Sequence, residues 1–293
     1  MANVAMYYYE LLNARELLET RESSLADARM ILEAAKELRQ AGLRADTDLI
    51  VAKAAVSEIL MTVTQQRASA AIAYGKLMAA LGMPMESKLA VEAKPDGMQN
   101  PHFQEGIKAL LVFADEQRAD LLAKQAALAE ARARVQRASR APLPKVRGLG
   151  QAGWLKYGKG HEHGYNYSGG LAVDIPLFKG FTYMYQKRQA LADAEISAAE
   201  LSELHNSVAL EVLTYSEMVK SACERKDYSE EFFTEASQAY EHALESYKAG
   251  LINVFDLLQT QRYLADARNK RAQTQTEWLV SLSQLAFAIG SIK

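Results

Sequence analysis

The sequence predicts a mainly α-helical protein of long antiparallel coiled-coil helices, with a duplicated α-hairpin and one two-stranded β-hairpin. Three observations predict this fold class. Glycine clusters in one short region, apolar residues elsewhere recur at steps of three and four residues, and the chain aligns with itself at an offset of 208 residues. The 293 residues are 49% hydrophobic and 24% charged, which is typical of a folded protein.

Composition narrows the possible classes of function. The chain has 34 Lys and Arg against 36 Asp and Glu, so a formal net charge of −2 gives no reason to expect nucleic acid as a partner. The single cysteine, Cys223, excludes an intramolecular disulfide and a cysteine-rich zinc site, and we expect it to be a small buried residue. No apolar run reaches the length of about 18 residues that would predict a transmembrane helix.

The first 82 residues are expected to form a helical hairpin. A helical pattern is already running by Leu11 and Leu12, and Met1 to Glu10 lacks the features of an export signal. An A-G-L turn at Ala41 to Leu43 separates this helix from a returning helix that ends at Gly82. Glycine at such a helix end adopts the left-handed conformation that closes the last turn.

The same hairpin occurs again near the C-terminus. An offset of 208 residues places Gly42 on Gly250 and Gly82 on Gly290 without a gap. Further residues are identical to the residue 208 positions later: Glu33, Ala35, Glu37, Ala41, Leu43, Asp48, Leu49, Gln65, Leu77 and Ala80. The long helix of the second copy starts near Gly180, so about 28 of its residues have no counterpart in the first copy. We therefore expect a chain shortened at its N-terminus.

A connector, a helix and a β-hairpin are expected between the two copies. Met83 to Phe103 contains prolines, and a helix is predicted from about Gln104 to Arg140. Tyr165 to Ile175 alternates apolar with small or polar residues, which predicts a strand paired with Val146 to Tyr157 across the loop Gly158 to Gly164. Because two strands alone are marginal in water, the hairpin belongs either to a transmembrane β-barrel or to a soluble cap on a coiled coil.

Helices of unusual length follow the strands. Phe181 to Ala249 has 69 residues without glycine or proline, which as one helix would be about 100 Å long. Its apolar residues follow a coiled-coil seam that includes Tyr240 and Tyr247. The seam of the last segment, Val254 to Ile289, carries polar residues at Gln261, Arg268, Arg271 and Gln275. Either this middle section faces water, as in a channel wall, or the seam rotates around the helix.

No arrangement of residues indicates an enzyme or a cofactor. The sequence has no Ser-His-Asp set and no P-loop. Gly148, Gly150 and Gly153 match the dinucleotide-binding motif G-x-G-x-x-G, but they lie inside a predicted strand with no helix after it, so the match is spurious. His161, Glu162 and His163 could bind a metal ion, but two histidines two positions apart on a loop form a weak site. No metal site is predicted.

Three segments carry a family pattern. They are L-P-K-V-R-G-L-G at Leu143 to Gly150, L-A-V-D-I-P-L-F-K-G at Leu171 to Gly180, and Y-K-A-G-L-I-N-V-F-D-L-L-Q-T-Q at Tyr247 to Gln261 followed by L-A-D-A-R at Leu264 to Arg268. In this order and spacing they resemble the outer-membrane efflux proteins of the TolC family. The duplicated hairpins of that family agree with the internal repeat.

The resemblance implies a homotrimer in the outer membrane with a periplasmic extension. Each full-length protomer would give four strands to a shared outer-membrane β-barrel and long helices to a tunnel that passively exports drugs or proteins. A periplasmic adaptor (membrane fusion) protein and an inner-membrane pump would be partners, and outer-membrane lipid would surround the strands. With two strands per protomer a trimer would have six, too few for a channel of the usual width, so we expect compromised conduction.

The resemblance also implies candidate site residues. Asp256 falls on the family's acidic entrance motif, and three copies would form an anionic ring, weakened by Gln259 at the second acidic position. An Asp that stabilises the start of a helix is the alternative explanation. The resemblance implies that adaptors dock at the two hairpin tips. The alternative explanation is that the glycines of the tips only form the turns that close the helices. The tips are Ala41, Gly42, Leu43 and Arg44, and Ala249, Gly250, Leu251 and Ile252.

The expected organisation has five segments. They are a first, incomplete α-hairpin (1–82), an equatorial connector (83–103), a helix to the barrel (104–141), a transmembrane β-hairpin (142–179) and a second α-hairpin of tunnel helices (180–293). The alternatives are a soluble coiled-coil scaffold, a non-functional fragment and, with too few strands to favour it, an adaptor protein. A barrel hairpin should make the chain depend on detergent, whereas a scaffold should be soluble.

Overall fold

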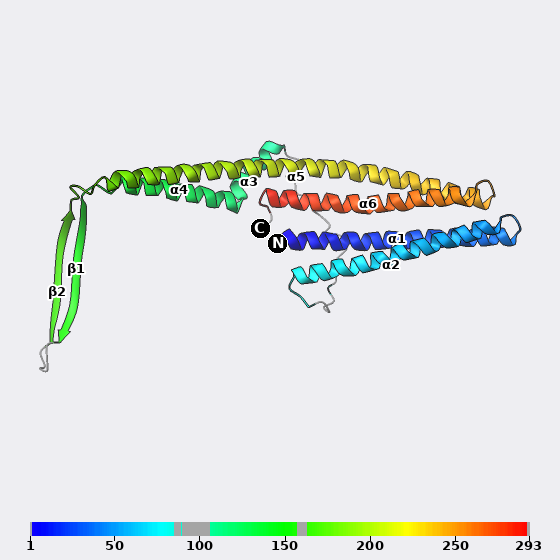
Figure 1. Cartoon of the computed structure of the whole chain (residues 1–293), viewed down its shortest axis with the longest axis horizontal. Helices are drawn as coiled ribbons and strands as arrows, with labels where there is room; N and C mark the ends of the chain where they lie inside the picture. Colours follow the sequence, from blue (N-terminus) through cyan, green and yellow to red (C-terminus); the bar gives the residue numbers. More distant parts are fainter. Residues whose placement is uncertain (1, 85–88, 90–105, 157–162, 292–293) are drawn as a thin grey trace. The chain divides into compact units, whose positions relative to one another are not determined.

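The described residues of the computed structural model are 2–84, 89, 106–156 and 163–291 (Figure 1). They form six helices and one antiparallel sheet of two strands, in the order α1, α2, α3, α4, β1, β2, α5, α6. The prediction of a mainly helical chain with one β-hairpin is confirmed for this part of the chain. Nearly all of the predicted connector, Met83 to Phe103, lies outside the described residues.

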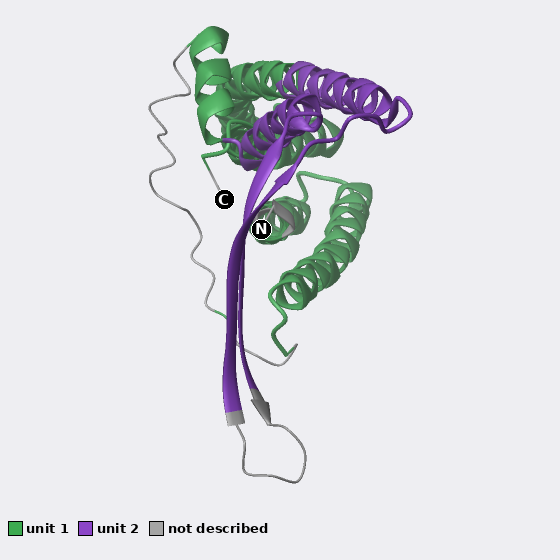
Figure 2. Cartoon of the chain, turned by 90° about the vertical axis from the view of Figure 1, so that its left-hand side faces the viewer, with its two compact units in different colours: residues 1–117, 209–293 green, residues 118–208 purple. Residues whose placement is uncertain are grey.

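The chain divides into two compact units, which Figure 2 shows in different colours. Unit 1 comprises residues 1–117 and 209–293, and unit 2 comprises residues 118–208. Helix α5 (Thr182–Lys248) is a single element of 67 residues that contributes to both. The predicted long helix is therefore present. No helix in the described ranges combines the length and apolarity needed to cross a lipid bilayer.

The two α-hairpins of unit 1 repeat each other in length and position. The first consists of α1 (Ala2–Gln40) and α2 (Asp46–Ala80), and the second consists of the last part of α5 and α6 (Val254–Ala288). Helices α2 and α6 both have 35 residues, and both of their ends are related by the offset of 208. The C-terminal ends of α1 and α5, Gln40 and Lys248, are related by the same offset. The helix boundaries thus reproduce the repeat found in the sequence.

Glycines with positive φ close the four helices of these hairpins. After α1, the N–H of Gly42 donates to the carbonyl of Arg39 and the N–H of Leu43 donates to that of Leu38, both at 2.9 Å. The same pair of bonds follows α2, α5 and α6. The φ values are 73° for Gly42, 67° for Gly82, 81° for Gly250 and 76° for Gly290. These are Schellman motifs, the helix ends that glycine favours.

One apolar core joins the four helices of unit 1. Its buried members come from α1, α2, α5 and α6: Ile31, Ala34, Ala35, Ala52, Tyr240, Tyr247, Val254, Leu257, Leu258 and Leu264. The predicted seam residues Tyr240 and Tyr247 lie in this core. Three of the members are alanines, whose small side chains let helix axes approach closely. Removal of this surface from water is the main stabilisation of the paired hairpins.

Three of the four polar seam residues of α6 contact neighbouring helices. Gln261 is buried and donates from Nε2 to a main-chain carbonyl of α1 at 3.5 Å. Arg268 forms an ion pair with Asp27 of α1 at 2.5 Å, and Arg271 forms one with Glu230 of α5 at 2.7 Å. Successive seam residues therefore meet α1 and then α5. This favours the interpretation in which the seam rotates around α6.

The prediction of one helix from about Gln104 to Arg140 is wrong. The structure has α3 (Ile107–Gln117) and α4 (Ala119–Arg140), because Arg118 is extended, with φ −72° and ψ 117°. The Arg118 guanidinium donates to the Asp120 carboxylate at 2.8 Å, and that carboxylate accepts the N–H of Leu121 at 2.9 Å. Asp120 lies in the first turn of the new helix, α4, where its negative charge is favourable. The bond from Arg118 is also the main cause of a lowered pKa at Asp120.

Cys223 is exposed, so the expectation of a buried cysteine is wrong. Its neighbour Ala222 is buried and takes the interior position on this turn of α5. The next residue of an α-helix points about 100° away, which turns the Cys223 side chain toward solvent. A labelling experiment on this chain therefore needs Cys223 replaced.

Candidate functional site

The two predicted tips lie next to each other in unit 1. The Arg44 guanidinium of the first tip donates a hydrogen bond to the main-chain carbonyl of Ile252 in the second, and these two residues occupy equivalent positions of the repeat. The same guanidinium lies 5.2 Å from the centroid of the Tyr247 ring. Each tip also presents one large apolar side chain, with Leu43 70% and Leu251 78% exposed. The structure thus brings the eight predicted tip residues together.

A tyrosine of the second hairpin is bonded to an acid of the first. Tyr247 is fully buried, and its hydroxyl donates to the Asp48 carboxylate at 3.3 Å. Asp48 lies in the first turn of α2 and is the repeat counterpart of Asp256. Burial, followed by the Asp48 charge, raises the pKa of Tyr247 to about 12. The hydroxyl therefore remains a donor at neutral pH.

Titration of Tyr247 should make the chain less stable in alkali. The folded state keeps a proton that the unfolded state releases above pH 10, so this stabilisation is complete below pH 10 and is lost as pH rises toward about 12. The loss should be about 2 kcal/mol in the free energy of unfolding. Helical circular dichroism during urea unfolding at pH 9 to pH 12 measures it.

Tyr247→Phe should make this alkaline decline shallower, because the titrating hydroxyl is absent. Tyr240 should continue to contribute, since burial also raises its pKa. The exposed Tyr228 provides the control, and Tyr228→Phe should leave the decline unchanged. An equal decline in the native chain and in Tyr247→Phe would contradict the assignment.

Asp256, in the first turn of α6, and Gln259, in the second, are both exposed. Asn253 caps this helix, and its side-chain oxygen accepts the N–H of Asp256 at 2.9 Å. Leu257 and Leu258, between the two polar residues, are buried in the core. The Asp256 carboxylate is thus near the positive end of the helix and open to solvent. This placement is compatible with an acidic entrance ring and also with an Asp that only stabilises the start of a helix.

The register of β1 (Lys145–Lys156) and β2 (His163–Asp174) separates two faces. Residues paired across an antiparallel sheet share a face, and neighbours along a strand lie on opposite faces. One face has only apolar, aromatic or glycine residues: Val146, Gly148, Gly150, Ala152, Trp154, Tyr165, Tyr167, Gly169, Leu171 and Val173. The other face includes Lys145, Arg147, Gln151, Asn166, Ser168 and Asp174. The alternation that the sequence predicts is confirmed.

The large side chains on the apolar face of this β-hairpin are exposed. Trp154 is 58% exposed, and Tyr165, Tyr167 and Leu171 are 82% to 85% exposed. Within the described residues β1 and β2 pair only with each other, so both outer edges leave main-chain groups unpaired. An isolated sheet of two strands is marginally stable at best in water.

Aromatic residues mark both ends of the β-hairpin. Trp154, Tyr165 and Tyr167 lie toward the loop end, whereas exposed Phe178 and Phe181 follow β2 at the helix end. Each strand has 12 residues, which span about 40 Å along the strand and about 30 Å across a bilayer at the usual tilt. Aromatic bands at this separation are typical of strands that cross a membrane.

The described residues contain no group of three His, Cys, Asp or Glu side chains placed to hold a metal ion. His161 and Glu162 of the weak candidate metal loop lie outside them.

The structure also shows what the sequence did not reveal, namely the bonds between the two α-hairpins. Asp48 could have been found as the counterpart of Asp256, but its bond to Tyr247 depends on how the four helices pack.

The comparisons with known proteins agree with this geometry. The sequence model of the family described as Outer membrane efflux protein matches residues 110–291, which is more than half of the chain. The chain belongs to the outer membrane efflux protein family. Outer membrane protein TolC of Vibrio cholerae is 25% identical over 298 residues, with 99% of this chain and 67% of that protein covered. Pyoverdine export outer membrane protein OpmQ of Pseudomonas putida is 25% identical over 303 residues, with 98% and 61% covered.

Solved structures show the same fold. The outer-membrane channel OprN matches with a TM-score of 0.75 and 22% identity over 99% of this chain and 65% of that one. VceC of Vibrio cholerae matches with a TM-score of 0.73 and 19% identity over 99% and 69%. The chain spans 61% to 67% of the length of the curated relatives. The TolC-like resemblance is confirmed, as is the predicted location in the outer membrane with a periplasmic extension. The family consists of channel proteins, not enzymes.

Proposed function

We propose that the chain is a wall component of an outer-membrane export channel. Strands β1 and β2 join other strands in a closed barrel, and the helices contribute to a periplasmic tunnel. The observation that carries the proposal is the two-faced β-hairpin with open edges, attached to a helix of 67 residues. A closed barrel pairs both edges, places the apolar face against lipid and turns the polar face toward the lumen.

Passive export with two partner proteins fits this family. One relative is named for pyoverdine export, and a solved neighbour is described as an outer-membrane channel. We infer that an inner-membrane pump supplies the energy and that a periplasmic adaptor docks at the tips. Leu43 and Leu251 support this docking, because two equivalent turns present exposed apolar side chains at one end of unit 1.

An exposed apolar stripe on α2 supports a homotrimer. Ile50, Met61 and Ile72 are each more than 60% exposed and follow one another at steps of 11 residues. Eleven residues make just over three turns of an α-helix, so these side chains form one line along the helix. Such a line favours a lasting partner, and a second copy of the chain provides one.

Asp256 is proposed to form the entrance ring of the trimer. Its carboxylate is exposed at the start of α6, close along the chain to the tip at Gly250. Three such carboxylates around an axis attract cations and repel anions, and Gln259 beside them adds no charge. The bonds from Tyr247 to Asp48 and from Arg44 to Ile252 hold this tip against the first hairpin.

Expression behind a cleavable export signal in a Gram-negative host tests the proposal. We expect the chain in the outer-membrane fraction, and extraction with detergent should give a particle of three times the 32.4 kDa chain mass. Met61→Asp should shift this particle to the monomer, because it places a charge in the α2 stripe. Lys53→Asp, on an exposed position of the same helix, is the control and should leave the trimer intact. A soluble, monomeric periplasmic protein would overturn the proposal.

A further inference from the structure

Basic residues are concentrated where the helices of unit 2 meet the strands. Residues 131–154 contain six Lys or Arg and residues 175–192 contain three, and neither stretch contains an Asp or Glu. The first stretch includes the end of α4 and most of β1, and the second leads from β2 into α5. The formal net charge of the whole chain is −2, so this junction differs strongly from the rest of the chain.

The strand register places two of these cations on the polar face of the β-hairpin. Lys145 pairs with Asp174 and Arg147 pairs with Ala172, so all four residues share that face. The Arg147 guanidinium lies 3.9 Å from the Asp174 carboxylate, and both side chains are more than half exposed, so this ion pair is weak. Two cations and one anion leave a net positive charge at this end of the polar face.

The polar face carries charge only at its helix end. Beyond Arg147, the residues that the register assigns to this face are uncharged: Leu149, Gln151, Gly153, Leu155, Gly164, Asn166, Ser168, Gly170 and Ala172. Ser168 is four residues from Ala172, which is about 13 Å along the strand and is more than the screening length of about 8 to 10 Å at physiological salt. The positive potential is therefore confined to the part of the face next to the helices.

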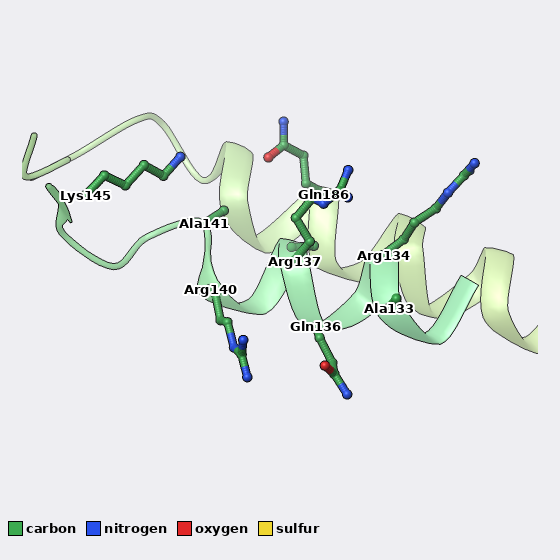
Figure 3. Close-up of a pocket in the computed structure, with 9 residues that line it drawn as sticks. Ala133, Arg134, Gln136, Arg137, Arg140, Ala141, Lys145 and Gln186 are labelled. Atoms are coloured by element: carbon green, nitrogen blue, oxygen red, sulfur yellow. The ribbon is translucent and has the colours of Figure 1, made fainter. Parts of the chain in front are cut away.

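A third cation lies on the side toward which Lys145 extends. An open cavity of about 670 Å³ is lined by the end of α4 and the starts of β1 and α5, and none of its described lining residues is acidic. In Figure 3, Arg137 lies beside Gln186 and Lys145 extends toward the same side, whereas Arg140 projects from the other side of α4. No salt bridge between described residues involves Arg137 or Lys145. Arg137 also offsets the dipole at the end of α4, but that role does not account for the cations of β1.

We propose that Arg137, Lys145 and Arg147 form a basic girdle around the lumen at the helix end of the barrel, and that this girdle favours anionic cargo over cationic cargo. The proposal rests on the proposed function, because it requires the polar face to line a lumen and the chain to be repeated around an axis. Rings of Lys and Arg select anions in pores. The cargo class is an organic anion that is concentrated by the local potential and is not held in a closed site, because the cations are exposed.

Paramagnetic reagents of different charge test this proposal. A nitroxide label is placed at position 172, opposite Arg147, in a Cys223→Ser chain inserted into phosphatidylcholine vesicles, whose lipid has no net charge. The collision rate with anionic chromium oxalate, divided by that with a neutral nickel chelate, measures the local enrichment of anions. A label at position 168 of the same face gives the reference. We expect this ratio to be about threefold higher at position 172 than at position 168 in about 0.1 M salt.

Variants of the girdle should move this ratio in opposite directions. The triple variant Arg137→Gln, Lys145→Gln, Arg147→Gln should lower the ratio at position 172 to that at position 168 or below it. Asp174→Asn should raise the ratio at position 172, because it removes the one acid of this part of the face. A ratio that does not change in either variant would overturn the proposal.

A second triple variant is the matched control. Arg15→Gln, Arg29→Gln, Lys53→Gln removes the same charge from exposed positions of α1 and α2 and should leave the ratio at position 172 unchanged. An equal fall in both triple variants would assign the effect to the net charge of the chain and overturn the proposal. Equal ratios at positions 172 and 168 in the unaltered girdle would also overturn it.

Protease protection of the β-hairpin in the same vesicles separates this proposal from the proposed function. A protected hairpin with equal ratios at the two positions overturns the basic girdle alone. An unprotected hairpin overturns both, because there would then be no lumen for the girdle to line.

Discussion

Leu171→Arg is expected to keep the β-hairpin out of the membrane, whereas Ser168→Arg is expected to leave it inserted. Leu171 belongs to the apolar face of β2, opposite Gly148, and Ser168 belongs to the polar face, opposite Gln151. An Arg that faces hydrocarbon costs about 2 to 4 kcal/mol near the middle of the bilayer, whereas an Arg that faces a polar lumen costs little. In a trimer the cost at Leu171 would apply to every chain.

The share of the chain in the outer-membrane fraction, with protease protection of the hairpin, measures this difference. Both variants add the same charge to the same strand, so Ser168→Arg controls for charge and for side-chain size. Equal insertion of the two variants would contradict the assignment of the apolar face to lipid. Equal loss of both would mean that the hairpin tolerates no charge on either face, which a barrel with a polar lumen does not predict.

Arg268→Ala is expected to lower the free energy of unfolding of the paired hairpins by about 3 kcal/mol. The Asp27 side chain is only 10% exposed and its carboxylate lies 2.5 Å from Arg268, so removal of the guanidinium leaves a nearly buried charge without its partner. Tyr240 is also buried close to this pair, and the Asp27 charge contributes to its raised pKa. Urea unfolding followed by helical circular dichroism at neutral pH measures the loss.

The double variant Asp27→Leu, Arg268→Leu should recover most of this stability. Replacing both members of a buried ion pair with apolar residues is often neutral, because no unpaired charge remains. Lys220→Ala serves as the control, since it breaks the exposed pair with Glu217 and should cost less than about 1 kcal/mol. A double variant as unstable as the sum of its two single variants would contradict the pairing.

The parts of the fold that depend on local chemistry could be predicted from the sequence. Gly42 and Gly250 mark helix ends because glycine readily adopts the positive φ that closes the last turn of a helix. The internal repeat then predicts that α2 and α6 have equal lengths. The alternation in β2 likewise predicts two faces without knowledge of any partner. In contrast, the break between α3 and α4 at Arg118 has no glycine or proline to mark it, so no local pattern in the sequence predicts it.

The parts of the candidate site that depend on packing could not be predicted. Tyr247 reads as a seam residue, and only the placement of α2 beside it shows that its hydroxyl meets Asp48. The exposure of Cys223 could not be predicted, because the orientation of a residue on a helix of 67 residues depends on small rotations accumulated along it.

The central claim is that one face of the β-hairpin contacts lipid while the other faces an aqueous lumen. Nitroxide labels on single cysteines placed in turn at positions 166 to 173, in a Cys223→Ser background, test it most directly in reconstituted vesicles. Accessibility to dissolved oxygen should be high at Tyr167, Gly169, Leu171 and Val173. Accessibility to a water-soluble paramagnetic reagent should be high at the four positions between and beside them. Uniform access of the water-soluble reagent to all eight positions would contradict the account and indicate a soluble cap.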